Sequence, residues 1–212
     1  MDTDDLIRSL AADNDWRTTP TGTALLIALL VAAPLSIAIF LMALGVRPDV
    51  MIAMHNPFFD LKFVITLALA ISAIALVLPL SRPGAVLGAR PWLLLLPVAL
   101  LAIGIVVDLT MPQDRGWSER LIGTNSRVCM TAIPAMALPL LVAALIGLRR
   151  GAATRPALSG AAAGLLCGGL AATVYAAHCT DDSPLFVATW YSIGIAGLTA
   201  VGAAAGSRVL RL

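Results

Sequence analysis

Cysteine and histidine supply the reactive side chains of this sequence, and they are few. The 212 residues contain three cysteines, Cys129, Cys167 and Cys179, and two histidines, His55 and His178. Paired thiols can be oxidised to a disulfide, or they can bind thiophilic metal ions with histidine as a further ligand. The sequence has no phosphate-binding glycine loop, no H-E-x-x-H metal signature and no Ser/His/Asp arrangement beside them. The chemistry to be explained is therefore that of the thiols.

The elements that carry these cysteines are long apolar runs. Hydrophobic residues make up 59% of the chain and charged residues 12%, about half of the ~25% that is typical of soluble domains. Six blocks reach the roughly 20 apolar residues that a helix needs to cross a ~30 Å hydrocarbon layer. They run approximately over residues 23–46, 61–80, 92–109, 128–148, 157–177 and 185–201. We therefore expect an all-α, polytopic integral membrane protein with six transmembrane helices.

The positive charges predict the orientation of these helices. Nine arginines lie on the side of the N-terminus, whereas four arginines and one lysine lie on the other side. Positive residues near helix ends favour the cytoplasmic side, so both termini are expected there, in a bacterial inner membrane. The chain then divides into a cytoplasmic partner-binding segment (1–21), a six-helix transmembrane domain (22–207) and a basic cytoplasmic tail (208–212).

Counting residues places two of the cysteines at the same depth. The helices expected at 128–148 and 157–177 are joined by a short connection and form an antiparallel hairpin. Cys129 and Cys179 lie 24 and 26 residues from Ala153 in that connection, roughly 36 to 39 Å at a rise of 1.5 Å per residue. Both thiols should reach the periplasmic face, where disulfides persist. An oxidant-sensing pair, a soft-metal site with His178, a structural disulfide and two unrelated small residues all remain open, whereas Cys167 is expected to serve packing.

Small residues indicate how the last two helices pack. Gly160, Gly164 and Gly168 recur every four residues, and Gly202 and Gly206 repeat this spacing near the end of the chain. Such spacing lets helix backbones approach closely in a bilayer.

Asp108, at the end of the third apolar block and near the outer interface, is the one candidate for an ionisable group in the membrane, and we expect a solvated or capping role for it. A proton-coupled carrier usually has several buried ionisable groups, so this class is disfavoured.

The N-terminal segment has the pattern of a docking helix. Asp4 and Asp5 would stabilise its first turn, and Leu6, Ile7 and Leu10 would share one face. An apolar stripe beside acidic residues suits a groove on a partner protein. The alternative is a helix that lies on the lipid surface, but such helices are usually basic.

Several short motifs connect the chain to a known family. They are Asp4-Asp5-Leu6-Ile7 to Leu10-Ala11, Val46-Arg47-Pro48-Asp49, Arg149-Arg150-Gly151 with Thr154-Arg155-Pro156, Tyr175-Ala176-Ala177-His178-Cys179, and Asp182-Ser183-Pro184-Leu185-Phe186-Val187-Ala188 with Trp190-Tyr191. Over nearly its full length the chain resembles the NrsF family of bacterial membrane anti-sigma factors, the negative regulators of sigma F.

The resemblance implies a function and a site. A member of this family would hold an extracytoplasmic-function sigma factor at the membrane and release it under stress, such as oxidants or heavy metals. The resemblance associates the positions of Cys129 and Cys179 with that response. It implies no enzymatic activity, no cofactor and no direct contact with nucleic acid. Membrane lipid is a further expected partner, and the resemblance leaves open whether the chain forms a homo-oligomer.

Two rival classes use the same residues. A membrane thiol oxidoreductase would use the cysteines as catalysts, but the chain lacks the C-x-x-C pair that lowers a thiol pKa in such enzymes. A small metal or solute transporter would need the buried charges that the apolar blocks lack.

Overall fold

Every regular element that the structure describes is a helix. The computed structural model describes residues 2–12, 20–84, 86–112 and 116–211, with the backbone alone for Leu6 and residues 9–12. The elements are α1 (Thr3–Ala12), α2 (Thr21–Ala43), α3 (Val50–Ala53), α4 (Pro57–Leu80), η2 (Arg90–Leu94), α5 (Leu95–Thr110), α6 (Trp117–Ile122), α7 (Ser126–Leu148), α8 (Pro156–Ala176), α9 (Pro184–Phe186), η3 (Val187–Tyr191) and α10 (Ser192–Val209).

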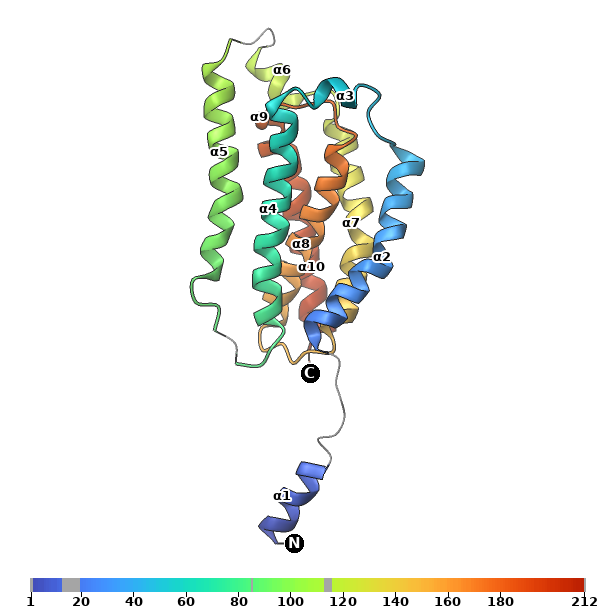
Figure 1. Cartoon of the computed structure of the whole chain (residues 1–212), viewed down its shortest axis with the longest axis vertical. Helices are drawn as coiled ribbons and strands as arrows, with labels where there is room; N and C mark the ends of the chain where they lie inside the picture. The colour runs from blue at the N-terminus through green and yellow to red at the C-terminus, as the bar shows by residue number, and fades with distance from the viewer. Residues whose placement is uncertain (1, 13–19, 85, 113–115, 212) are drawn as a thin grey trace.

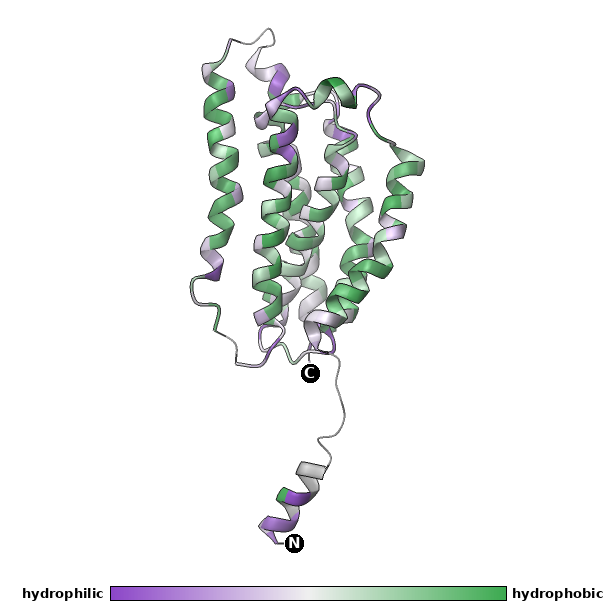
Figure 2. Ribbon diagram, in the orientation of Figure 1, coloured by the Kyte–Doolittle hydropathy of each residue, from purple (hydrophilic) through white to green (hydrophobic). Residues whose placement is uncertain are grey.

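Six of the helical stretches are long and apolar enough to cross a membrane. They are Thr21–Ala43, Pro57–Leu80, Arg90–Thr110, Trp117–Leu148, Pro156–Ala176 and Pro184–Val209. This confirms the expected number of spans. Because the number is even, α2 begins and α10 ends at the same end of the bundle (Figure 1). Hydrophobic residues cover the spanning helices along most of their length, and polar residues gather in α1 and at the two ends of the bundle (Figure 2).

Proline and short polar caps determine where several helices begin. Pro57, Pro156 and Pro184 occupy the first helical position of α4, α8 and α9, where the missing N–H costs no hydrogen bond. Asn56 caps α4 by accepting from the backbone N–H of Phe58 at 3.1 Å. The connections before α4, α8 and α9 therefore lead into a residue that favours the start of a helix.

Helix α8 lies at the centre of the bundle and packs most closely against α10, then against α4 and α7. Helices α2 and α5 are peripheral, since most of their side chains face outward. Figure 1 shows α5 standing beside α4 at one edge and α2 leaning on α7 at the other. The outward faces of these two helices are the surfaces that lipid would cover.

Glycine forms the contact between α8 and α10. A Cβ added at Gly160 would collide with the carbonyl oxygen of Gly202 and lie 2.8 Å from the Cα of Gly206. A Cβ added at Gly164 would lie 2.9 Å from the Cα of Thr199. Gly168 instead meets the side chain of Ile195, at 3.2 Å. Backbone touches backbone at Gly160 and Gly164, so no side chain lies between the two helices there that could give way.

We expect Gly160→Ala to lower the free energy of unfolding by roughly 1–3 kcal/mol, because the new methyl group overpacks a contact between two backbones. Gly197→Ala is the matched control on α10, where an added Cβ meets no atom within 4 Å. Its effect should stay within about 0.5 kcal/mol. Unfolding in detergent, followed by circular dichroism, measures both. Equal losses in the two variants would contradict the packing described.

Candidate functional site

Cys129 and Cys179 lie at the same end of the bundle. Cys129 is in the first turn of α7, and Cys179 follows the end of α8 by three residues. Both thiols are free and fully buried, and both belong to the main hydrophobic cluster. Cys167 is also buried, but it lies 12 residues before Cys179 on α8, about 18 Å along the helix axis.

A buried lysine holds residues 177–182, the segment that carries Cys179 (the Cys179 segment). Lys62, in the second turn of α4, has a side chain that is only 1% exposed. Its Nζ donates to the carbonyl oxygen of Cys179 at 2.9 Å and to Oδ1 of Asp182 at 2.6 Å. A buried ammonium is costly unless it is paired and hydrogen-bonded. The Cys179 segment therefore supplies the groups that make Lys62 tolerable at this position.

Arg47 reaches the same segment from the connection after α2. Its Nη1 donates to Asp182 Oδ1 at 3.0 Å and to the carbonyl oxygen of Cys179 at 3.3 Å. Its Nε and Nη2 form a bidentate pair with Asp49, at 2.8 and 2.7 Å. The hydrogen bonds from Arg47 hold the pKa of Asp49 below its ordinary value of 3.8, at about 2, and those to Asp49 raise the pKa of Arg47. Phe59 lies 5.4 Å from the guanidinium and 5.3 Å from the ammonium, so its ring faces both cations.

Two further contacts tie the connection after α2 to the end of α8. The backbone N–H of Arg47 donates to the carbonyl oxygen of Ala177 at 3.1 Å. The Nδ1 atom of His178 lies 3.0 Å from the carbonyl oxygen of Gly45. Backbone and side-chain contacts therefore fix residues 45–47 to residues 177–182, so a displacement of one segment should move the other.

Asp181 ties the same segment to the start of α7. Its carboxylate accepts from the backbone N–H groups of Thr124 at 3.0 Å and Asn125 at 2.8 Å. The Nδ2 atom of Asn125 also donates to Thr180 Oγ1 at 2.9 Å. A carboxylate is favourable at a helix N-terminus, where N–H groups lack partners. Gly123, with φ of +61°, allows the close approach, since an added Cβ would lie 2.7 Å from Cγ of Asp181.

Three aromatic side chains pack together at this end of the bundle. Tyr175 and Tyr191 pack with their ring centroids 5.6 Å apart, and Phe186 lies 6.3 Å from Tyr191. Tyr175 Oη donates to the carbonyl oxygen of Asn125 at 3.5 Å. The hydroxyl of Tyr191 lies beside the Cys179 thiol, yet it makes no hydrogen bond of ordinary geometry with any described residue.

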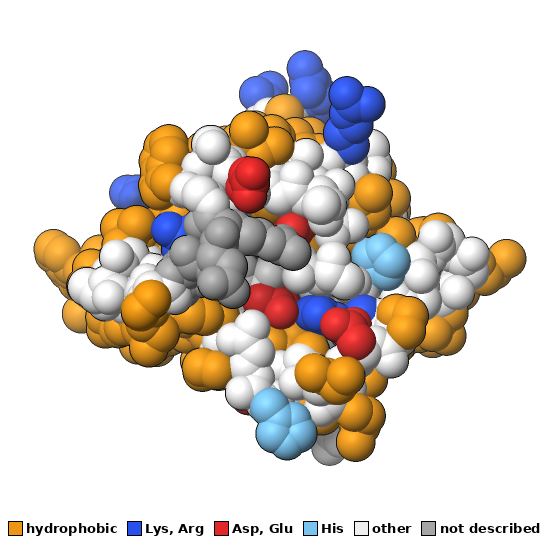
Figure 3. Space-filling view, turned by 90° about the horizontal axis from the view of Figure 1, so that it is seen from above, with side chains coloured by type: hydrophobic (Ala, Val, Ile, Leu, Met, Phe, Trp, Pro, Cys, Tyr) orange, Lys and Arg blue, Asp and Glu red, His pale blue; other side chains and the backbone are white. Residues whose placement is uncertain are grey.

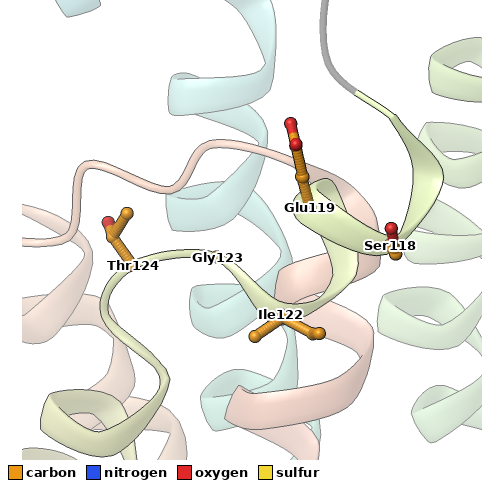
Figure 4. Close-up of a pocket in the computed structure, with 5 residues that line it drawn as sticks. All are labelled: Ser118, Glu119, Ile122, Gly123 and Thr124. Atoms are coloured by element: carbon orange, nitrogen blue, oxygen red, sulfur yellow. The ribbon is translucent and has the colours of Figure 1, made fainter.

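Oppositely charged side chains meet near the middle of this end of the bundle. Figure 3 views the end of the bundle face on, and acidic and basic side chains lie together near the middle of the face. A pocket of about 370 Å³ opens beside it, lined by Ser118, Glu119, Ile122, Gly123 and Thr124. Glu119 and Ile122 point to opposite sides of α6 (Figure 4). With one carboxylate, this pocket offers no set of metal ligands.

The structure does not bring His178 into a metal site with the thiols. Among the described residues, no group of three or more His, Cys, Asp or Glu side chains is arranged to hold a metal ion. One ring nitrogen of His178 already faces the carbonyl oxygen of Gly45.

The N-terminal residues predicted to bind a partner lie on α1. Asp4 and Asp5 are in its first turn and are exposed, and the side chain of Ile7 is 58% exposed. The side chains of Leu6 and Leu10 lie outside the described residues. Figure 1 draws α1 apart from the bundle, beyond the end where α2 begins.

The prediction for Asp108 was wrong. Its side chain is buried, and its Oδ2 accepts from Nη1 of Arg120 at 2.6 Å. The sequence argument also missed the burial of Lys62 and Arg47, which it counted only among the positive charges on the side opposite the N-terminus. The signal was present in the motif Val46-Arg47-Pro48-Asp49 and in the acidic pair Asp181-Asp182, which together offer opposite charges at one end of the bundle.

Comparison with known proteins identifies relatives along the whole chain. The family described as negative regulator of sigma F matches residues 10–212. A protein of Caulobacter vibrioides (strain NA1000 / CB15N) named anti-sigma-F factor NrsF is 38% identical over 216 residues, which cover 100% of both chains. A probable anti-sigma-F factor NrsF of Azospira oryzae (strain ATCC BAA-33 / DSM 13638 / PS) is 34% identical, again over 100% of both. No solved structure matches the chain significantly.

Burial raises the pKa of the Cys179 thiol, which predicts slow alkylation of the folded chain. In a Cys129→Ser/Cys167→Ser background, iodoacetamide at about pH 7.5 should react roughly tenfold more slowly with folded protein than with protein unfolded in dodecyl sulfate. The folded rate should still rise above about pH 9, where a free thiol levels off, since the reactive thiolate forms only at higher pH. Equal rates before and after unfolding would show that the thiol is exposed.

Proposed function

Since this chain belongs to the NrsF family of negative regulators of sigma F, we propose that it holds an extracytoplasmic-function sigma factor at the bacterial inner membrane and releases it on a thiol-reactive signal. Membership in the family makes the chain an anti-sigma factor with a sigma factor as its partner, a regulatory and non-enzymatic role. The type of sigma factor, the signal and the residues that sense it are our proposal.

The observation that carries the proposal is the pair of buried, free thiols at one end of the bundle. Cys129 and Cys179 come from the ends of two antiparallel helices, α7 and α8, and share one cluster. An oxidant that accepts two electrons and two protons would join their Sγ atoms in a disulfide. A thiophilic metal ion would instead displace both protons and bind the two thiolates. Either reaction would draw the end of α8 towards the start of α7.

The distribution of charge supports a periplasmic position for the thiols. Arg82, Arg90, Arg149 and Arg150 lie in connections at the opposite end of the bundle, where α2 begins and α10 ends (Figure 1). Positive residues in short connections favour the cytoplasmic side. The thiol end would then face an oxidising compartment.

The N-terminal segment, residues 1–21, is proposed to hold the sigma factor. Helix α1 presents exposed Asp4, Asp5 and Ile7, a combination of acidic and apolar side chains that suits a groove lined by apolar and basic groups. Its position at the end of the bundle opposite the thiols supports a signal that crosses the membrane domain. The closure at Cys129 and Cys179 would shift the helices and release α1 from the complex.

Replacing either thiol should abolish the response without abolishing repression. We expect Cys129→Ser and Cys179→Ser to keep sigma-dependent transcription at its uninduced level after treatment of cells with a thiol oxidant or a thiophilic metal salt, because the pair can no longer close. A reporter gene under the sigma-dependent promoter measures this. Cys167→Ser is the matched control, because it removes a buried thiol from the middle of α8 and should respond as the native chain does. Full induction in both of the first two variants would refute the sensing role.

Changing the exposed face of α1 should weaken capture of the sigma factor. Ile7→Asp is expected to lower the amount retained by the purified, detergent-solubilised chain roughly tenfold, because it places a charge in an apolar contact. The sigma factor to use is the one whose promoters become active when this chain is deleted. Arg8→Lys on the same helix keeps its charge and serves as the control. Unchanged retention by Ile7→Asp would move the binding surface elsewhere.

A further inference from the structure

The segment that carries Cys179 is attached to two different parts of the bundle by two consecutive carboxylates. Asp181 binds the start of α7, the helix of Cys129, whereas Asp182 binds Lys62 of α4 and Arg47 in the connection after α2. We infer that Asp182, with Lys62 and Arg47, is the joint that couples the thiol segment to α2 and thereby to the N-terminal helix. This inference rests on the proposed function, since it names the residues that pass the signal on.

Breaking the joint is costly because its cations are removed from solvent. The side chains of Lys62 and Arg47 are 1% and 6% exposed, and that of Asp182 is 15% exposed. Both cations also donate to the carbonyl oxygen of Cys179, at 2.9 and 3.3 Å. A buried ion pair that loses one partner leaves an uncompensated charge, which is strongly unfavourable. The joint therefore holds together or gives way as a unit.

Closure of the thiols acts directly against this joint. The two cysteines are free, so their Sγ atoms must approach to about 2.05 Å to form a disulfide. Cys179 would have to move towards α7, while its carbonyl oxygen is held by Lys62 and Arg47 on the side of α4 and α2. The disulfide and the hydrogen bonds to Lys62 and Arg47 require different positions of Cys179, so formation of the disulfide strains those hydrogen bonds.

Helix α2 is the element best placed to respond. It packs chiefly against α7 and is otherwise peripheral, so fewer contacts hold it than hold α8 or α4. Residues 45–47 at its far end are attached to residues 177–182 by the contacts of Arg47 and His178. Its other end, at Thr21, is separated from α1 by eight residues, 13–20. Helix α2 thus connects the joint to residues 13–20, the segment that links it to α1.

The test asks whether breaking the joint replaces the signal. Asp182→Asn in a Cys129→Ser background removes the partner of both cations in a chain that cannot respond through its thiols. We expect sigma-dependent transcription to rise roughly tenfold without any oxidant, since the equilibrium shifts to the releasing state. Lys62→Gln in the same background should release as well, whereas Lys62→Arg, which keeps the charge, should restore repression.

Asp108→Asn is the matched control for damage by a broken ion pair. It disrupts the buried pair with Arg120 at the same end of the bundle, but Asp108 does not contact the Cys179 segment through any hydrogen bond described. Repression should persist in this variant. Quantifying each variant in the membrane and by its retention of sigma factor in detergent separates release from loss of protein.

The possible results decide the matter. Full repression by Asp182→Asn in the Cys129→Ser background would overturn the joint, and so would equal release by Asp108→Asn. If Asp182→Asn does not accumulate, the comparison of Lys62→Gln with Lys62→Arg decides in its place. If that variant is also lost, Arg47→Lys, which keeps the charge but loses the bidentate fork, must release partially, or the joint is refuted. Failure of the native chain to retain any sigma factor would instead refute the proposed function.

Discussion

The placement of one ammonium group constrains this whole end of the molecule. Lys62 lies in an otherwise apolar helix and is almost completely buried, so it must find carboxylate and carbonyl oxygens close by. Those oxygens come from Asp182 and Cys179, more than one hundred residues later in the chain. The path of the connection after α8 is therefore decided by the electrostatics of α4. The buried position of the Cys179 thiol follows from that path.

The sequence was sufficient for the helices and for the depth of the cysteines. Long apolar runs become helices in a membrane because lipid offers the backbone N–H and C=O groups no hydrogen-bond partners. The fixed rise per residue of a helix then places Cys129 and Cys179 at one end of the bundle. It was not sufficient for the burial of Lys62 or the pairing of Asp108 with Arg120. Both depend on how each helix is rotated about its axis, and an almost uniformly apolar helix carries no pattern that determines this rotation.

Charge pairing also changes how the positive residues of the thiol end are interpreted. Five basic residues lie at that end by sequence, but Arg47, Lys62 and Arg120 are each paired with a carboxylate in the structure. These three serve the packing of the end itself. The contrast with the opposite end, where Arg82, Arg90, Arg149 and Arg150 are in open connections, is therefore larger than the counts of residues suggest.

The glycine contact between α8 and α10 divides the bundle into parts with different mechanical duties. Where the two backbones are in direct contact, α8 and α10 should move as one rigid unit. No side chain lies between them there that could change its rotamer to absorb a displacement. A pull on the end of α8 is then not dissipated inside the bundle. It would have to appear at the edge of the bundle, where α2 and α5 are held by fewer neighbours and would face lipid. The thickness and fluidity of the surrounding bilayer would thus influence how strong a signal the molecule needs in order to respond.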